Sequence, residues 1–530
     1  MAAVGALLTA AVVAFQLHSG AYVAEFGDDE ASHYISGLLI HDYLAGGWRQ
    51  SPIAFLKLFH SHYPLVGIGH WPPLYYAVEA LWMLAFSPAR ASMLALSAAV
   101  SVGTALICYL FVARRCGRAL AFFSAFAFVA SPLVQGSSAE LMLDVPVAFL
   151  CLLAAVSYAK YLETYRARYS ALFGALATAA LLVKGNGGCL ALLPPFALLI
   201  GRRYDLLWRP SFWLPLPIVA VLAGPWYALT YGLAEQGFRF GWGIGFVRMA
   251  SVANAEIIYD AVGPIVLAVA VIGLIAVLVA PRASPGPEGF VAAAALFVSV
   301  YVFHSVVPVA IQDRYLAPAV PALVVLAARG AALISERLAV WLARAGSLMA
   351  AVAGLMALSL VPFALGAAKK AQLGLIAASA QIWMQRSDRN PSVLIVSDGR
   401  GEAAAIAELA MLDPGRPSLF AIRGSRLLGA GGYNNRDYVP RFASAAGVMA
   451  AIDEYAIPFV LYRAGGSVGE WAHLRQIAEA RTRFPDRWEL IYQDSRASPE
   501  IVVFRVRGNE TKAIDAAKVM ALSAPRGLSQ

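Results

Sequence analysis

Three consecutive carboxylates, Asp28, Asp29 and Glu30, follow the first apolar segment of this chain. Carboxylates at a membrane boundary are costly to keep out of water, so their presence there indicates a function. A carboxylate can also orient a hydroxyl group and remove its proton. The triplet is therefore the first candidate for an active site.

Charged residues also lie at the ends of later apolar segments. Asp144 opens one segment, and Glu140 is expected one helical turn earlier on the same face. Lys184 and Arg314 carry cationic groups suited to phosphate, and Arg314 can bind it with two parallel hydrogen bonds. Structural alternatives stay open: a helix cap or ion pair for Asp144, extension to lipid headgroups for Lys184, and pairing of Arg314 with Asp313.

The composition indicates a membrane protein. Hydrophobic residues make up 60% of the chain, charged residues only 14%, and the mean hydropathy is +0.66. A net charge of +9 could indicate nucleic acid binding, but the basic residues gather in every second loop. That arrangement is typical of cytoplasmic loops in multi-pass proteins, so no nucleic acid partner is expected.

The apolar segments predict about eleven transmembrane helices, because each approaches the roughly 20 residues that cross a bilayer. The expected spans are 2–18, 91–113, 119–135, 143–160, 169–184, 187–201, 211–231, 259–281, 290–309, 315–331 and 339–366. With a cytoplasmic N-terminus, the acidic triplet, Asp144, Lys184, the loop 232–258 and Arg314 all face outward. The first span could instead be a cleaved signal peptide.

The first outer loop is expected at about 19–90. It contains two amphipathic pieces near 32–46 and 52–60, and a helix over 72–86 that is expected to lie at the membrane surface. Five histidines in this loop match no compact metal motif, so interfacial polar residues are favoured over a zinc site. The four cysteines show no paired spacing and predict neither a disulfide nor a metal site.

Beyond residue 366 short apolar runs alternate with helical patterns, which predicts a small α/β domain over 367–506 and a flexible tail over 507–530. Strands are expected at 393–397, 458–462, 488–493 and 500–506, and helices at 402–411, 448–455 and 470–480. The Gly-rich stretch 428–435 lacks the strand and helix that flank a nucleotide-binding motif, so it predicts a surface loop.

Several short motifs recur in an order that resembles the GT-C membrane glycosyltransferases, most closely the protein O-mannosyltransferase and lipid A aminoarabinose transferase branch. The resemblance covers about residues 20–330. The motifs are Asp29-Glu30-Ala31 with Tyr34, Trp71-Pro72-Pro73-Leu74-Tyr75-Tyr76, Leu143-Asp144-Val145-Pro146, Lys184-Gly185, Pro225-Trp226-Tyr227, and Arg314-Tyr315-Leu316-Ala317-Pro318 with Pro321.

The resemblance implies an enzyme that transfers a hexose or pentose from a polyprenyl-phosphate carrier to an acceptor hydroxyl, with inversion, at the outer membrane face. Asp29 matches the catalytic base of the family, and Asp28 and Glu30 could share that role. Asp144 matches the second acidic position, where it would position the acceptor or a basic partner. Lys184 and Arg314 would bind the donor phosphate. The residues expected to position donor or acceptor are Glu140, Tyr34, Trp71, Tyr75 and Tyr315.

The sequence departs from this family at Trp71, where many relatives have a lysine before the two prolines. The phosphate contact of that lysine is then either absent or supplied by His70, by Lys57 or by an arginine of the loop 232–258, such as Arg239 or Arg248. A divalent cation held by the acidic triplet is a further alternative, as in the oligosaccharyltransferase branch.

The resemblance places the protein in the cytoplasmic membrane, with an extracytoplasmic C-terminal domain. Its partners would be the lipid-linked donor, membrane lipid, and a protein, lipid or glycan acceptor. Two other classes remain as alternatives: a transporter or flippase of lipid-linked sugars, and a membrane scaffold without catalysis. A transporter predicts internal repeats, and none is evident in the sequence.

Overall fold

The computed structural model describes residues 1–238, 240–283, 286–342, 345–366, 368–431, 438–463, 471–494, 497 and 499–523. The chain forms two compact units. The helical unit comprises Met1–Ala21, Ile68–Tyr75 and Leu94–Lys369. The mixed unit comprises Tyr22–Gly67, Tyr76–Met93 and Lys370–Gln530, so it joins most of the first loop to the C-terminal part of the chain.

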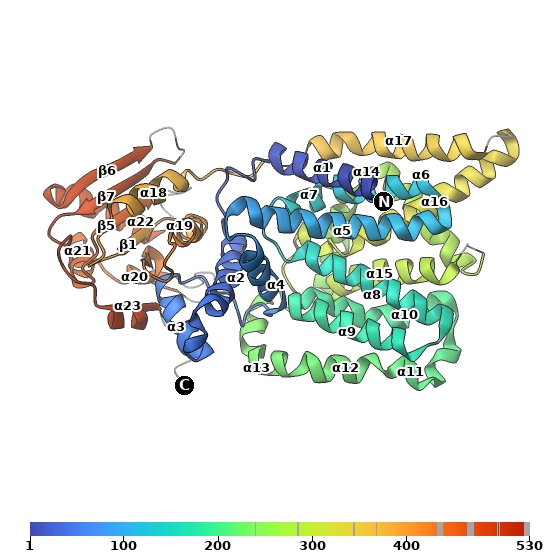
Figure 1. Cartoon of the computed structure of the whole chain (residues 1–530), viewed down its shortest axis with the longest axis horizontal. Coiled ribbons are helices and arrows are strands. Elements are labelled where there is room, and N and C mark those ends of the chain that lie inside the picture. Colours follow the sequence, from blue (N-terminus) through green and yellow to red (C-terminus); the bar gives the residue numbers. More distant parts are fainter. Residues whose placement is uncertain are drawn as a thin grey trace. The chain divides into compact units, whose positions relative to one another are not determined.

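Apolar helices, some long and some short, build the helical unit (Figure 1). They are α1 (Ala2–His18), α5 (Arg90–Cys116), α6 (Arg118–Ala130), α7 (Pro132–Ser138), α8 (Asp144–Thr164), α9 (Ala167–Val183), α10 (Leu193–Gly201), α11 (Pro210–Trp213), α12 (Pro215–Leu222), α13 (Gly224–Ala234), α14 (Ile244–Val279), α15 (Pro287–Val306), α16 (Ala319–Leu342) and α17 (Ala345–Leu365). Short 3-10 turns at Gly185–Leu192, Tyr204–Trp208, Glu235–Gly237 and Asp313–Leu316 connect some of them.

Five described helices are long and apolar enough to cross a membrane: α5, α8, α14, α15 and α16. The number rises to seven if two bent pairs each count as one span. Every expected span coincides at least in part with a helix, but several helices are short, so a count of eleven stays a prediction.

Three of the expected spans are not straight α-helices. The span 119–135 is a pair, α6 and α7, bent by 60°, because Pro132 excludes the helical conformation at Ser131. The span 211–231 is likewise bent by 61° between α12 and α13. The first half of the span 187–201 is a 3-10 helix rather than an α-helix.

The loop expected at 232–258 is also largely helical, because α14 begins at Ile244 and continues to Val279. It is kinked at Gly263, whose φ of +71° suits glycine, directly before Pro264. Further along, Gly273 meets Gly330 of α16 so closely that a Cβ on either glycine would lie 2.0 Å from a carbonyl oxygen of the other helix. Small residues thus allow the two backbones to touch.

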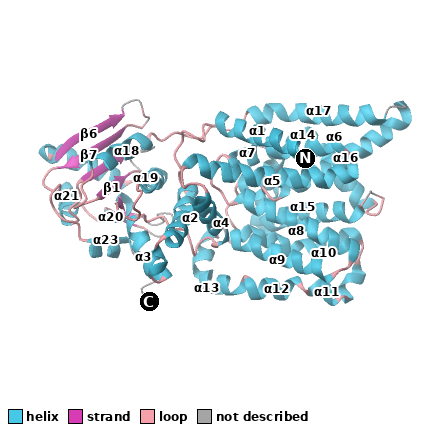
Figure 2. Cartoon of the chain, in the orientation of Figure 1, coloured by secondary structure: helices cyan, strands magenta, loops and turns pink. Residues whose placement is uncertain are grey.

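The mixed unit contains all the named strands in the described part of the chain, drawn in magenta in Figure 2. They form a five-stranded sheet in the order β2 (Phe420–Arg423), β1 (Ser392–Val396), β5 (Phe459–Arg463), β7 (Ile501–Val506) and β6 (Trp488–Asp494). β1 is parallel to β2 and β5, whereas β7 is antiparallel to β5 and β6. A short hairpin pairs β3 (Gly429–Ala430) with β4 (Val439–Pro440).

Helices complete the C-terminal part: α18 (Leu375–Gln385), α19 (Gly399–Leu412), α20 (Gly424–Leu427), α21 (Ala445–Glu454), α22 (Ala472–Arg483) and α23 (Ala516–Ser523). The predicted α/β domain is therefore present, although β2 was not expected. Part of the Gly-rich stretch 428–435 lies outside the described residues. The tail expected to be flexible contains α23 instead, because Val519 is buried in the domain core.

The first-loop helices of the mixed unit are α2 (Asp29–Ala45), α3 (Pro52–His62) and α4 (Leu74–Ala85), close to the positions predicted for amphipathic helices. α2 packs against α19, and α3 packs against β2 and α23. The ring of His62 stacks on that of Phe420 at 3.8 Å. The loop that carries the acidic triplet is thus part of the same compact unit as the C-terminal domain.

Candidate functional site

The acidic triplet lies at the N-terminus of α2. Asp28 is the residue before the helix, and Asp29 and Glu30 are in its first turn. The positive end of the helix dipole favours negative charge at these positions. Asp28 has φ of +54°, an unusual value for a residue with a side chain, and its carboxylate does not cap the helix. Strained backbone of this kind concentrates at functional sites.

Glu30 forms a buried ion pair with Lys370, the first residue of the C-terminal segment of the mixed unit. The Lys370 ammonium lies 2.9 and 2.7 Å from the two Glu30 carboxylate oxygens. Both side chains are less than one-tenth exposed. Both carboxylate oxygens of Glu30 are therefore engaged by Lys370.

A buried polar cluster adjoins Asp29. Tyr76 Oη lies 2.8 Å from His33 Nδ1, and both residues are buried. Burial raises the pKa of Tyr76 well above its ordinary value, and the charges of Glu79 and Asp29 raise it further. Glu79 is completely buried, neither of its oxygens has a hydrogen-bond partner, and burial raises the pKa of its carboxyl well above the usual range. Burial thus favours the protonated form of the Glu79 carboxyl.

His33, Tyr76 and Glu79 were not among the predicted site residues. Glu79 had a usable signal, because it is the one ionisable carboxyl group in the apolar segment Leu74–Ala85. Tyr34, which was predicted, lies fully buried on α2 and donates a hydrogen bond to the Pro88 carbonyl at 3.1 Å. Burial raises the pKa of Tyr34.

A second group of predicted residues gathers in the helical unit. Asp144 opens α8, and its Oδ1 accepts a 2.7 Å hydrogen bond from the Lys184 ammonium. The two side chains are 1% and 8% exposed. The Lys184 ammonium also lies 4.6 Å from the ring centre of Tyr315, and the Arg314 guanidinium lies 5.7 Å from the same ring. Four predicted residues thus meet in one place.

These contacts decide between the alternatives left open for the charged residues. Lys184 does not extend to the surface but is buried on Asp144, which supplies the expected ion pair. Asp144 Oδ2 has no hydrogen-bond partner. The Arg314 side chain donates to Gln312 Oε1 at 2.8 Å, whereas Asp313 accepts from the Arg314 backbone N–H at 2.7 Å. The Lys184 ammonium and the Asp144 carboxylate therefore form a buried ion pair.

The remaining predicted residues lie elsewhere. Glu140 is in the turn between α7 and α8, so the expected shared helix face with Asp144 is wrong; Pro146 fixes the start of α8 at Asp144, because proline is tolerated only in the first turn. His70 Nδ1 is 3.3 Å from the Leu233 carbonyl oxygen, and its ring meets that of Trp71 edge-on.

Three positions complete the predicted set. Tyr75 is buried in the helical unit, and Arg248 is an exposed residue of α14. Arg239 lies outside the described residues. Within the described ranges no three His, Cys, Asp or Glu side chains are arranged to hold a metal ion.

Comparisons with known proteins extend this picture. The model of the dolichyl-phosphate-mannose-protein mannosyltransferase family matches residues 70–228. The crystal structure of ArnT from Cupriavidus metallidurans bound to undecaprenyl phosphate matches 96% of this chain and 99% of its own, with a TM-score of 0.61 and 15% identity. The apo form of the same protein matches 99% and 100%, with a TM-score of 0.61 and 16% identity. The protein has the GT-C fold.

A further match with the GT-C fold is the oligosaccharyltransferase AglB from Archaeoglobus fulgidus, in complex with an inhibitory peptide and a dolichol-phosphate. It covers 93% of this chain and 73% of AglB, with a TM-score of 0.52 and 12% identity. No curated protein sequence matches this chain. The resemblance expected from the motifs, to GT-C membrane glycosyltransferases with ArnT as a near neighbour, is confirmed.

Proposed function

We propose that this protein is a membrane glycosyltransferase that moves a hexose or pentose from a polyprenyl-phosphate donor to a hydroxyl of a protein, lipid or glycan acceptor, with inversion. The observation that carries the proposal is the position of Asp29 in the first turn of α2 in a chain with the GT-C fold. The ligands of the two neighbours, undecaprenyl phosphate in ArnT and dolichol-phosphate in AglB, support a polyprenyl-phosphate carrier.

In this mechanism Asp29 accepts the proton of the acceptor hydroxyl as its oxygen attacks the anomeric carbon. The attack comes from the face opposite the phosphate, so the configuration inverts. The bond between the anomeric carbon and the phosphate oxygen breaks, and its electron pair remains on the polyprenyl phosphate. The products are the glycosylated acceptor, polyprenyl phosphate and a proton on Asp29, which is released to solvent before the next cycle.

Lys184 and Arg314 stabilise the negative charge that grows on the leaving phosphate. Asp144 holds the Lys184 ammonium by the 2.7 Å hydrogen bond, and the Tyr315 ring lies against it. A cation fixed before the reaction stabilises developing charge without a reorganisation cost. Asp144 therefore acts as a positioning residue in this proposal.

The proposed location is the cytoplasmic membrane, with a cytoplasmic N-terminus and an extracytoplasmic mixed unit, because the basic loops then face the cytoplasm. The bent pair α6 and α7 and the kink in α14 are features that a transporter would also have. The match to ArnT over nearly its whole length favours the transferase over both the transporter and the scaffold.

The test is turnover of a panel of polyprenyl-phosphate sugars by the purified, detergent-solubilised protein. We expect release of polyprenyl phosphate by the wild type and loss of that release in Asp29→Asn. Asp486→Asn, an exposed carboxylate of the mixed unit, is the matched control and should retain wild-type turnover. Near-normal turnover in Asp29→Asn would overturn the assignment of the base.

A further inference from the structure

The carboxyl ends of β1 and β5 lie side by side in the C-terminal sheet. The two strands are parallel neighbours, with Val396 opposite Tyr462. After β1 the chain passes through α19 to β2 on one side, and after β5 it continues to β6 and β7 on the other. Ligands of open α/β sheets bind where connections diverge in this way. The ligand-binding edge of this domain is therefore the one that carries Asp398 and Arg463.

The N-terminus of α19 opens at this edge. The helix has 14 residues and starts at Gly399, directly after β1. The Asp398 carboxylate caps it by accepting a 2.7 Å hydrogen bond from the Gly401 N–H. The unpaired backbone N–H groups and the dipole of a first helical turn attract anions. A helix N-terminus alone does not make an anion-binding site; side chains around it must also bind the anion.

Arg463 provides the independent observation. It ends β5 and is only 7% exposed, and its Nε has no hydrogen-bond partner among the residues that the structure describes. Its Nη1 points to the start of α19, where it lies 3.8 Å from Asp398 Oδ1, too far for a hydrogen bond. A guanidinium buried with an unsatisfied donor is costly unless a ligand completes it.

Arg400 adds a second guanidinium to the same place. It is an exposed residue in the first turn of α19, and it makes no hydrogen bond or ion pair within the described residues. Its side chain lies against Gly27, so that a Cβ there would be 3.3 Å from Arg400 Nε. Gly27 belongs to the same compact unit and is two residues before Asp29. Arg400 thus lies beside the segment that leads to the candidate base.

Two carboxylates and a second guanidinium act on Arg463. Burial lowers the pKa of Arg463, the carboxylates of Asp398 and Glu25 oppose that shift, and Arg400 adds to it. Both carboxylates already accept hydrogen bonds from backbone N–H groups: Asp398 from Gly401, and Glu25 from Leu373 and Leu375. The two guanidinium groups therefore lie beside carboxylates whose oxygens are partly engaged elsewhere.

We infer that Arg463, Arg400 and the N-terminus of α19 bind a phosphate group carried by the acceptor. Guanidinium groups match the oxygen geometry of phosphate, and a helix N-terminus adds backbone donors. The donor phosphate has its own cations, Lys184 and Arg314, in the other unit. The assignment of the phosphate to the acceptor rests on the proposed function; the binding of phosphate does not.

The experiment is titration of the full-length detergent-solubilised protein with inorganic phosphate, followed by calorimetry at low ionic strength and without donor. We expect saturable binding, weakened about tenfold or more in Arg463→Gln and in Arg400→Gln, because each loses a charge-assisted hydrogen bond. Arg475→Gln is the matched control, since Arg475 is an exposed arginine of α22 that pairs only with Glu479 at 3.8 Å. It should bind phosphate as the wild type does.

Because Arg463 is buried, Arg463→Gln is also checked for folding by its unfolding temperature, and Arg400→Gln at the exposed position keeps the test independent of folding. Absence of saturable binding to the wild type, or wild-type binding by both variants, would overturn the inference. Repeating the titration in nanodiscs with phosphatidic acid distinguishes the source: competition assigns the site to a lipid-borne phosphate, and unchanged affinity assigns it to a soluble acceptor.

The same variants separate this inference from the proposed function. Arg400→Gln should raise the KM for acceptor, whereas the control Arg475→Gln should keep the wild-type KM. Phosphate binding without any turnover on any donor would refute the transferase and leave the anion site standing. Turnover without phosphate binding would refute the anion site and leave the transferase standing.

Discussion

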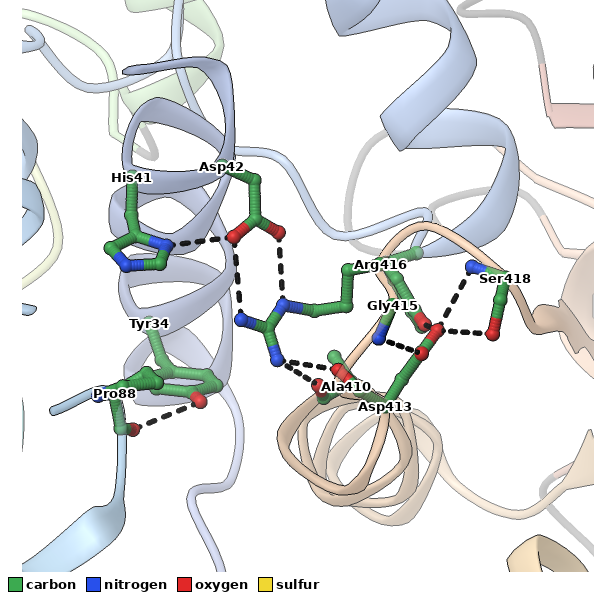
Figure 3. Close-up of polar contacts among 10 residues, drawn as sticks. Tyr34, His41, Asp42, Pro88, Ala410, Asp413, Gly415, Arg416 and Ser418 are labelled. Atoms are coloured by element: carbon green, nitrogen blue, oxygen red, sulfur yellow. Dashed lines mark hydrogen bonds and ion pairs between the residues drawn. The ribbon is translucent and has the colours of Figure 1, made fainter. Parts of the chain in front are cut away.

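The guanidinium of Arg416 holds both carboxylate oxygens of Asp42, with Nε 2.9 Å from Oδ2 and Nη2 3.3 Å from Oδ1 (Figure 3). Asp42 lies on α2, the helix that begins with Asp29, and Arg416 follows α19. The same guanidinium donates through Nη1 to the carbonyl oxygens of Ala410 and Asp413. One side chain therefore joins the candidate catalytic helix to the C-terminal domain.

Removal of Arg416 should destabilise the mixed unit. Arg416→Ala leaves the mostly buried Asp42 carboxylate with His41 but without its guanidinium partner, which costs about 3 kcal/mol. We expect a lower unfolding temperature in detergent, whereas Arg475→Ala should leave it unchanged. An unchanged unfolding temperature in Arg416→Ala would show that Asp42 is solvated instead of paired.

Asp413 should make stability depend on pH. Burial alone would raise the pKa of Asp413, but hydrogen bonds from Tyr63 and Ser418 lower it below the ordinary value of 3.8. A carboxyl with a depressed pKa stabilises the fold above its unfolded pKa and loses that contribution as pH falls through its folded pKa. The unfolding temperature should therefore fall below pH 3.8 in the wild type, and less steeply in Asp413→Asn. Equal slopes would contradict the prediction.

Glu30 and Asp29 should respond differently to loss of charge. Glu30→Gln weakens the buried pair with Lys370, so we expect lower stability with most of the turnover retained. Asp29→Asn should instead abolish turnover and leave the unfolding temperature near that of the wild type. If Glu30→Gln proved inactive and fully stable, the base would be Glu30.

The pair of Asp144 and Lys184 separates stability from catalysis. Asp144→Leu alone removes the carboxylate that pairs with the buried Lys184 ammonium and should destabilise the protein by about 3 kcal/mol. Asp144→Leu with Lys184→Met removes both charges and should restore much of that stability but not turnover. Recovery of turnover in the double variant would mean that the pair is only structural. Unfolding temperature and donor hydrolysis are the two measurements.

Local patterns predict much of this fold. Apolar segments place the helices, the short apolar runs at β1 and β7 give the strands, and the two prolines before Leu74 mark the start of α4. The bends could not be predicted, because a hydropathy pattern does not show how Pro132 changes the backbone direction at Ser131.

The candidate site is predicted only where a motif carries it. Asp29, Asp144, Lys184 and Tyr315 stand in short motifs, and the last three meet in the structure. Their partners do not stand in motifs: Lys370 is 340 residues from Glu30, and Arg416 is 374 residues from Asp42. A single sequence gives no information on pairs at that separation.

The composition of the mixed unit has a consequence for biosynthesis. Its first-loop helices are made early, but their partners are made only after the whole of Leu94–Lys369. The pairs are Glu30 with Lys370, Arg90 with Glu408, Tyr63 with Asp413, and Asp42 with Arg416. Until then α2 exposes buried acidic groups without their cations. In a nascent or C-terminally truncated chain, the candidate catalytic helix α2 is therefore expected to lack its C-terminal partners. The proposed activity should begin only when synthesis is complete.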